Sequence, residues 1–203
     1  MKLAGEYEFE APVGEVWTAL LDPVVLAAVM PGCEKLELVD DTYVGELDIK
    51  VGPVQGKFQG KVKLSDVEEE KGYTIDVDGR GQQGFVKATA SVKLTPEGDV
   101  VTHMEYDADA RVGGRIASVG QRLIESSAKA IIKESLEGLN ANVKARASTA
   151  EGEEAEVIQA SQTEFATKVA KEVAKDLVPP GARYALIALA LVGLGVLIYL
   201  LVR

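Results

Sequence analysis

Between Glu34 and Val112 the sequence alternates apolar and polar residues over six successive segments, which are separated by short turn-forming clusters. Alternation with a period of two is typical of strands that bury one face only. The connections are too short for crossover helices, so neighbouring strands must run antiparallel. Together with an alternating segment at Lys2–Phe9, the pattern predicts a curved antiparallel sheet of about seven strands, the later six at 34–39, 43–51, 54–67, 73–80, 85–94 and 100–112.

The alternation also assigns side chains to the two faces of this sheet. The face expected to be covered carries the large apolar residues Leu47, Ile49, Val51, Phe58, Val62, Leu64, Ile75, Val77, Val86, Val92, Leu94, Met104, Tyr106 and Val112. The opposite face carries charged side chains such as Lys61 and Asp76, together with the single histidine, His103. One face is therefore expected to meet solvent and the other to be covered.

The covered face is unusual in its small residues, which are Gly45, Gly56, Gly60, Ala88, Ala90, Ala108 and Ala110. Close packing needs large side chains there, so small ones on a concave sheet predict an apolar cavity. The glycines could instead serve only to bend the strands, although alanines contribute nothing to bending. The cavity is expected to be lined by Leu47, Phe58, Val62, Ile75, Val77, Ala88, Ala90, Met104, Tyr106, Ala108, Val119, Leu123 and Ile124. Tyr43, Tyr106 and Tyr73 are its expected polar groups.

Helices are predicted before and after the meander. Pro12–Leu21 has apolar residues at helical spacing, and Asp22 followed by Pro23 predicts a capped second short helix to about Val29. After Gly113-Gly114, a broad apolar stripe from Arg115 to about Val143 predicts a long helix that lies against the covered face of the sheet.

Three further segments follow this domain, which is expected to span residues 1–145. Residues 146–156 are small, polar and acidic, as in a flexible linker. Residues 157–180 repeat an apolar residue every fourth position, which predicts an amphipathic juxtamembrane helix. Its apolar stripe is narrow and rich in alanine, which favours a stalk or a docking helix over one that lies on the membrane surface.

Tyr184–Val202 contains 19 residues without a charge and is bracketed by Arg183 and Arg203. A helix of this length spans about 28 Å, close to the hydrocarbon thickness of a bilayer, so a transmembrane tail anchor is expected. A buried core helix is the alternative, but core helices are rarely apolar on all sides over five turns. The first residues lack an apolar signal sequence, which predicts an N-terminal domain in the cytoplasm.

The charge and the reactive side chains exclude several classes of function. The net charge of −10 argues against binding nucleic acid. One histidine and one cysteine, Cys33, cannot supply a histidine-rich metal site or a buried triad, so neither a metal nor a covalent cofactor is expected. Cys33 is interpreted as a small core or loop residue.

The order of these elements resembles the START-like helix-grip fold of the polyketide cyclase superfamily (SRPBCC). Within this superfamily, a more specific set of residues is Gly5, Ala11-Pro12, Val16-Trp17, Leu20, Asp22-Pro23, Leu26, Met30 to Cys33, Val51 to Gly60, Gly79 to Gly81, Ala88 to Ala90, Tyr106, Ala108-Asp109, Val112 to Gly114 and Gly120 to Ile124. In these residues the chain closely resembles the CoxG family of carbon monoxide dehydrogenase subunits, over about residues 1–143.

The resemblance implies a non-catalytic accessory protein that places a molybdenum hydroxylase, such as carbon monoxide dehydrogenase, at the membrane. Membrane lipid and an isoprenoid quinone such as menaquinone are the expected ligands, because a soluble dehydrogenase must pass electrons to a carrier that prefers the bilayer. A cyclase or dehydratase of the same superfamily and a plain lipid carrier are the alternatives.

Overall fold

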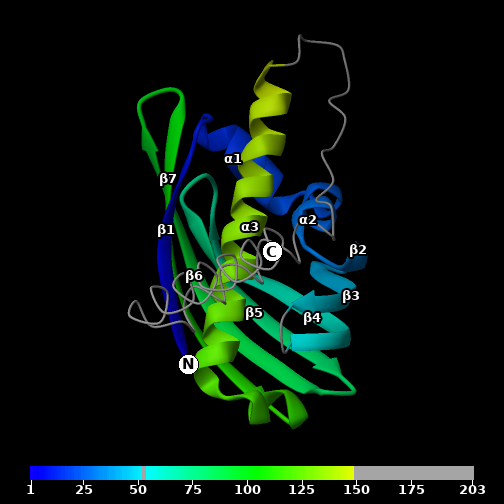
Figure 1. Cartoon of the computed structure of the whole chain (residues 1–203). Helices are drawn as coiled ribbons and strands as arrows, with labels where there is room; N and C mark the ends of the chain where they lie inside the picture. The colour runs from blue at the N-terminus through cyan, green and yellow to red at the C-terminus, as the bar shows by residue number, and fades with distance from the viewer. Residues whose placement is uncertain (52–53, 149–203) are drawn as a thin grey trace, which may run out of the picture.

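The computed structural model describes residues 1–51 and 54–148, which form one curved antiparallel sheet wrapped around a long helix (Figure 1). The described strands are β1 (Lys2–Phe9), β2 (Cys33–Val39), β3 (Thr42–Val51), β4 (Val54–Glu68), β5 (Gly72–Gly81), β6 (Gly84–Glu97) and β7 (Val101–Gly113). Their order across the sheet is β1-β7-β6-β5-β4-β3-β2, so only β1 departs from the sequential meander by pairing with β7. This confirms the predicted α+β architecture with seven antiparallel strands.

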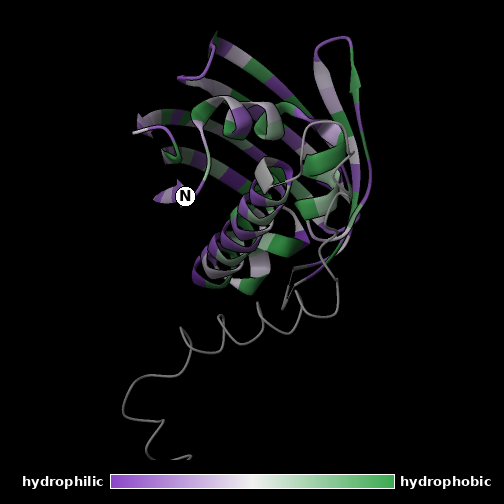
Figure 2. Ribbon diagram, turned by 90° about the horizontal axis from the view of Figure 1, so that it is seen from above, coloured by the Kyte–Doolittle hydropathy of each residue, from purple (hydrophilic) through white to green (hydrophobic). Residues whose placement is uncertain are grey.

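The strand register confirms the predicted division into an inner and an outer face. Val62 pairs with Val77, which in turn pairs with Ala88, and residues paired across antiparallel strands share a face. Lysines such as Lys61 and Lys63 are exposed on the outer face. The ribbon coloured by hydropathy shows the same alternation of polar and apolar residues along the strands (Figure 2).

Local residue chemistry explains the elements that precede the meander. α1 (Val13–Leu21) and α2 (Pro23–Val29) are separated by Asp22, whose side chain accepts hydrogen bonds from the backbone N–H groups of Val24 and Val25. Asp22 is therefore the predicted N-cap, and Pro23 stands at the first helical position, where no backbone donor is needed.

The segment after β7 differs from the single helix predicted over Arg115–Val143. It begins as a 3-10 helix, η1 (Arg115–Val119), and α3 (Gln121–Ser148) starts only after Gly120. Gly120 has a φ of 95°, a left-handed conformation that interrupts a helix and that glycine adopts most easily. Val119, predicted on the lid helix, consequently lies in η1.

The far end of α3 also differs from its prediction. The helix continues to Ser148, so its last turn occupies the start of the segment interpreted as a linker from residue 146. Within this turn an Arg146 guanidinium nitrogen lies 3.1 Å from an Asp22 carboxylate oxygen. This ion pair joins the C-terminal end of α3 to the N-terminus of α2, a long-range contact that local sequence composition does not reveal.

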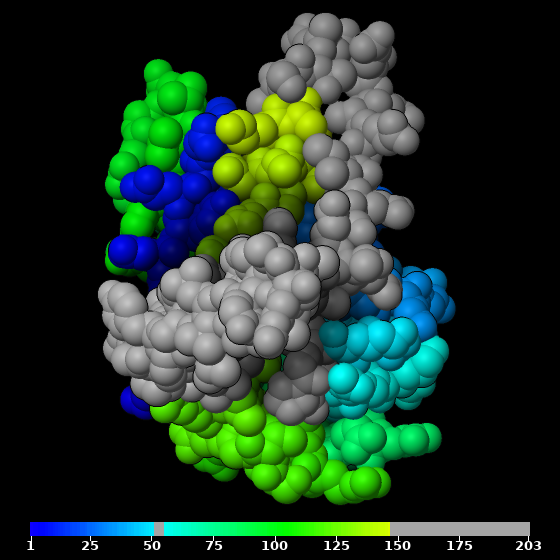
Figure 3. Space-filling model, in the orientation of Figure 1, coloured from blue at the N-terminus to red at the C-terminus, as the bar shows by residue number. Residues whose placement is uncertain are grey.

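The main hydrophobic core lies where α1, α2 and the C-terminal half of α3 meet one end of the sheet. Leu136, Leu139 and Val143 of α3 pack there with buried side chains of β1, α1, α2 and β5 to β7, including Phe9 and Trp17. In the space-filling view, the yellow C-terminal half of α3 lies next to the blue residues of β1 (Figure 3).

The rest of the predicted linker, the juxtamembrane helix and the anchor at Tyr184–Val202 lie outside the described residues. Among the helices that the structure does describe, none combines the length and the apolar character needed to span a bilayer.

Candidate ligand site on the inner face of the sheet

Side chains on the inner face of the sheet are closely packed at its two ends and only partly buried between them. Beyond the main core, the described residues form two small clusters, one of Phe58 with Ile116 and one of Ala130 with Leu123 and Ile131, and both include Ile49. Several inner-face residues between these regions are only partly buried and belong to none of the described clusters; among them are Leu47, Val62, Val77, Ala88 and Ala90. We call these five residues the inner row.

The remaining members of the predicted cavity lining lie at the margins of this row. Met104 belongs to the main core, and Ile75 and Tyr106 pack against that core. Phe58, Leu123, Ile124 and Ala108 are buried or belong to the far clusters. The structure thus brings all ten predicted strand residues to one face, and of these the five of the inner row are both partly buried and outside the described clusters.

The inner-face glycines have different roles. Gly56 has a φ of 138°, so its backbone conformation favours glycine, as the bending hypothesis requires. At Gly45 an added Cβ would lie 3.0 Å from Leu36 Cδ1, so the neighbouring strand leaves little room. At Gly60 an added Cβ would meet no described atom within 4 Å. Gly60 pairs with Gly45 on β3 and with Gly79 on β5, so these three strands carry no side chain at this level, and space remains above Gly60.

The three predicted polar groups are not equally free to bind a ligand. Tyr43 donates its hydroxyl hydrogen to the backbone carbonyl of Leu21 at 2.7 Å, which fixes β3 to α1. Tyr73 is buried, and its ring stands edge-on to Trp17 with centroids 5.7 Å apart. The Tyr106 hydroxyl lies across Gly5, where an added Cβ would come within 2.5 Å of it. This close approach explains why β1 carries a glycine at that position.

Burial raises the pKa of all three phenols, because the charged form loses hydration. For Tyr43 the negative charge of Asp22 adds to this effect, whereas the positive charge of Lys129 opposes it for Tyr106. The phenols are therefore protonated at neutral pH and can donate hydrogen bonds, but they are poor general bases.

The histidine and the cysteine lie at different places on the sheet, and Cys33, at the start of β2, is paired with Leu47 of the inner row. His103 is on the outer face, as predicted, with Nε2 3.9 Å from a Glu6 carboxylate oxygen. Burial raises the pKa of the Cys33 thiol, and its Sγ donates to the backbone carbonyl of Lys35 at 3.5 Å. In the described part of the chain, no three His, Cys, Asp or Glu side chains are grouped as metal ligands would be.

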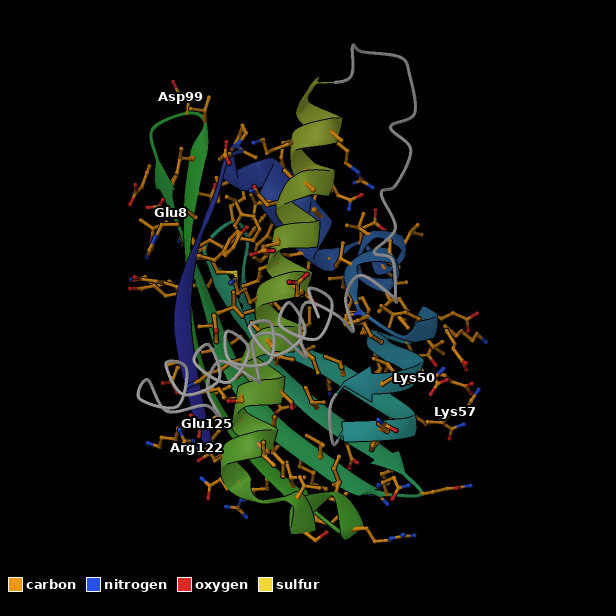
Figure 4. All side chains as sticks on the ribbon, viewed as in Figure 1. Glu8, Lys50, Lys57, Asp99, Arg122 and Glu125 are labelled. Atoms are coloured by element: carbon orange, nitrogen blue, oxygen red, sulfur yellow. The ribbon has the colours of Figure 1, made fainter. Side chains whose placement is uncertain are left out.

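The outer face presents charged side chains and only shallow hollows. One hollow of about 690 Å³ is lined by residues that include Lys61, Asp78, Lys87 and Arg111. In the view with all side chains, Lys50 of β3 and Lys57 of β4 point away from α3, while Arg122 and Glu125 lie at the start of α3 beside β1 (Figure 4). Charges thus surround the domain, and its inner row remains apolar.

The sequence interpretation missed Ser127, which lies in the first half of α3 with a relative exposure of only 1 %. Its hydroxyl has no hydrogen-bond partner among the described residues. The available signal was a serine between Ile124 and Ile131, within the apolar stripe of the predicted helix.

Comparisons with known proteins agree with this geometry. The CoxG family of carbon monoxide dehydrogenase subunits matches residues 5–144. A conserved protein from Geobacillus kaustophilus is 33% identical, with a TM-score of 0.69 over 71% of this chain and 95% of that one. Comparison with curated proteins gives no match.

Two more distant structures share the fold alone. One is a START superfamily protein from Mycobacterium smegmatis, which is 13% identical with a TM-score of 0.57 over 70% of this chain and 97% of that one. The other is the Zhui aromatase/cyclase from Streptomyces sp. R1128, which is 16% identical with a TM-score of 0.56 over 75% of this chain and 99% of that one. The fold is START-like, and the match over residues 5–144 places the chain in the CoxG family of carbon monoxide dehydrogenase subunits.

Proposed function

We propose that this protein is a non-catalytic accessory protein that holds menaquinone against the inner row and presents it to a membrane-associated molybdenum hydroxylase of the carbon monoxide dehydrogenase type. The observation that carries the proposal is the inner row itself. Its five side chains are all apolar, and four of them are alanine or valine. They are only partly buried, although they lie at the centre of a domain whose two ends are closely packed.

The composition of this region favours an apolar ligand of substantial size. Partly buried apolar side chains beside unfilled space at Gly60 would gain free energy from a ligand that removes them from water. An isoprenoid tail supplies such surface, and a quinone ring adds oxygens that can accept hydrogen bonds. Apolar pockets with few polar groups are the usual sites for ligands of this kind.

The molybdenum hydroxylase is proposed as the partner because of the family to which the chain belongs and because the enzyme and the quinone differ in solubility. A soluble dehydrogenase releases electrons in water, whereas a long-tailed quinone stays in the bilayer. A protein that binds the quinone in an apolar site and is itself tethered by Tyr184–Val202 would bring the two together. The tether limits the distance between the site and the membrane and so raises the effective concentration of both partners.

A carrier is favoured over a cyclase or dehydratase by the chemistry of the inner face. The tyrosines that reach it have raised pKa values, and the carboxylates of the neighbouring strands lie on the outer face. Acid–base catalysis needs groups that gain and lose protons near the working pH. The inner row offers no such group among the described residues.

The ligand proposal is tested by purifying the full-length chain in a mild detergent and analysing its extracted lipids by mass spectrometry. Menaquinone should be retained at up to one molecule per chain and should be enriched over bulk phospholipid relative to its ratio in the membrane. An aromatic polyketide or a phospholipid in its place would favour the cyclase or plain-carrier alternative. A chain that contains no quinone and ignores added menaquinone would refute the proposal.

The tether and the partner are tested by deleting residues 184–202 and fractionating the cells. Both the truncated chain and the dehydrogenase should move from the membrane to the soluble fraction. Replacing the segment by an unrelated transmembrane helix is the matched control and should restore both. A dehydrogenase that distributes identically in all three strains would contradict the accessory role.

A further inference from the structure

The side chain that the proposed carrier function leaves unexplained is Ser127. It is 1% exposed, and its Oγ has no hydrogen-bond partner among the described residues. A serine inside a helix commonly donates to the carbonyl four residues earlier, which here is that of Leu123, yet Ser127 does not. Leaving a buried hydroxyl unpaired costs free energy, so such a group calls for an explanation.

The neighbours of Ser127 on the helix show which way it faces. Residues three and four positions apart lie side by side on a helix surface, so Leu123, Ala130 and Ile131 flank Ser127. Ala130 packs with Ile49 of the inner face of β3, and Leu123 and Ile131 pack against Ala130 in the same cluster. Ser127 therefore lies on the side of α3 that faces β3.

The sheet on this side contains the unfilled space. Leu47 of the inner row is on β3, two residues from Ile49, and its partner strand β4 carries Gly60, where an added Cβ meets no described atom within 4 Å. The other two buried polar residues have partners: Thr102 Oγ1 donates to the Ala11 carbonyl, and Asn142 Nδ2 donates to that of Gly138. The second buried side-chain atom without a described partner, His103 Nδ1, belongs to a residue of the outer face. An unpaired hydroxyl thus borders the apolar region that the proposed ligand would occupy.

We infer that Ser127 Oγ donates a hydrogen bond to a ring oxygen of the bound lipid and so selects ligands with a carbonyl or hydroxyl group over pure hydrocarbons. The inference rests on the proposed function, because it assigns a residue to the same site. A ligand oxygen would satisfy the hydroxyl that the protein leaves unpaired. A hydrocarbon of the same shape would leave it unpaired and would bind less tightly.

The test compares menaquinone with a 2-methylnaphthalene that bears the same isoprenoid tail but lacks both oxygens. The full-length chain contains one tryptophan, Trp17, which lies edge-on to Tyr73 on the inner face. Quinones quench indole fluorescence, so titration with menaquinone reports binding directly. The hydrocarbon is then measured as a competitor that restores the fluorescence.

The wild-type chain should bind menaquinone more tightly than the hydrocarbon. Ser127→Ala should lower menaquinone affinity by about 3- to 10-fold, the usual value of one neutral hydrogen bond, and should leave hydrocarbon affinity unchanged. Alanine is the better helix former, so the variant should fold, which a thermal melt verifies. Ser126→Ala, at the adjacent and less buried position, is the matched control and should change neither affinity.

Equal loss of affinity for both ligands would mean that Ser127 only packs, and the inference would be overturned. Unchanged menaquinone affinity in Ser127→Ala would overturn it as well, while the proposed function would stand. A wild-type chain that binds neither ligand would refute the proposed function and this inference together.

Discussion

The main core and the inner row lie on the same face of the same sheet, yet their side chains are packed differently. The core contains fully buried large side chains, such as Phe9, Val16 and Leu139, drawn from both short helices, α3 and several strands. The inner row contains two valines, one leucine and two alanines that remain partly accessible. The difference arises because α1, α2 and the C-terminal half of α3 all converge on one end of the sheet.

This comparison indicates where the stability of the domain resides. Burial free energy scales with the apolar surface that is removed from water, so the converging helices concentrate it at one end. The middle of the inner face can then remain underfilled without unfolding the domain. Three predictions, each with a comparison variant, test this distribution of stability.

The largest effect is expected for Phe9→Ala in the main core. Phe9 is fully buried, and removing such a ring typically lowers the free energy of unfolding by about 3–5 kcal/mol. Val77→Ala in the inner row should lower it by only about 1 kcal/mol or less. Urea unfolding followed by Trp17 fluorescence measures both, and similar losses in the two variants would contradict the comparison.

A smaller effect, on binding rather than folding, is expected for Gly60→Val. Valine suits a strand and enters unfilled space, so the free energy of unfolding should stay equal or rise by about 0.5 kcal/mol. Menaquinone affinity should fall about tenfold or more, since overpacking a site costs about 1–3 kcal/mol. Lys61→Val makes a similar change on the outer face and should leave affinity intact. Full binding by Gly60→Val would show that the ligand lies elsewhere.

The smallest effect is expected for Asp22→Asn at the packed end. Burial tends to raise the Asp22 pKa, but hydrogen bonds from Arg146, Val24 and Val25 and the charge of Arg146 together lower it. Asparagine can still cap α2 but cannot form the ion pair with Arg146, so the free energy of unfolding at neutral pH should fall by less than about 1 kcal/mol.

The pH dependence of this effect has a definite sign. Because the folded-state pKa of Asp22 is lowered, its contribution to stability is present above the usual aspartate range and is lost as the pH falls through the folded-state pKa. The difference between wild type and Asp22→Asn should therefore shrink between pH 7 and pH 3, as measured by urea midpoints. Arg146→Gln should reproduce this behaviour, and a pH-independent difference would exclude the ion pair as its cause.

Much of the fold could be predicted from the sequence because its strands alternate cleanly and their turns are short. The Asp40-Asp41 turn is an example, since both residues adopt positive φ values of the kind that a two-residue hairpin needs. The residues of the inner face could be predicted for the same reason. Side chains along a strand alternate between the two faces, so assigning one residue to a face assigns all the others.

The remaining features depend on contacts between residues far apart in the sequence. The break at Gly120 and the extension of α3 to Ser148 reflect a left-handed residue and the Asp22–Arg146 ion pair. The different roles of Gly56 and Gly60 depend on backbone angle and local space, which composition does not encode. That the Ser127 hydroxyl is buried without a described hydrogen-bond partner likewise depends on which side of α3 faces β3.

The partial burial of the inner row also has a consequence for evolution. Substitutions at Val62, Val77, Ala88 or Ala90 remove or add few close contacts, so they should cost little stability. Selection can therefore alter the shape of this region residue by residue while the distant core keeps the chain folded. A scaffold with this arrangement can exchange one apolar ligand for another without first acquiring compensating mutations.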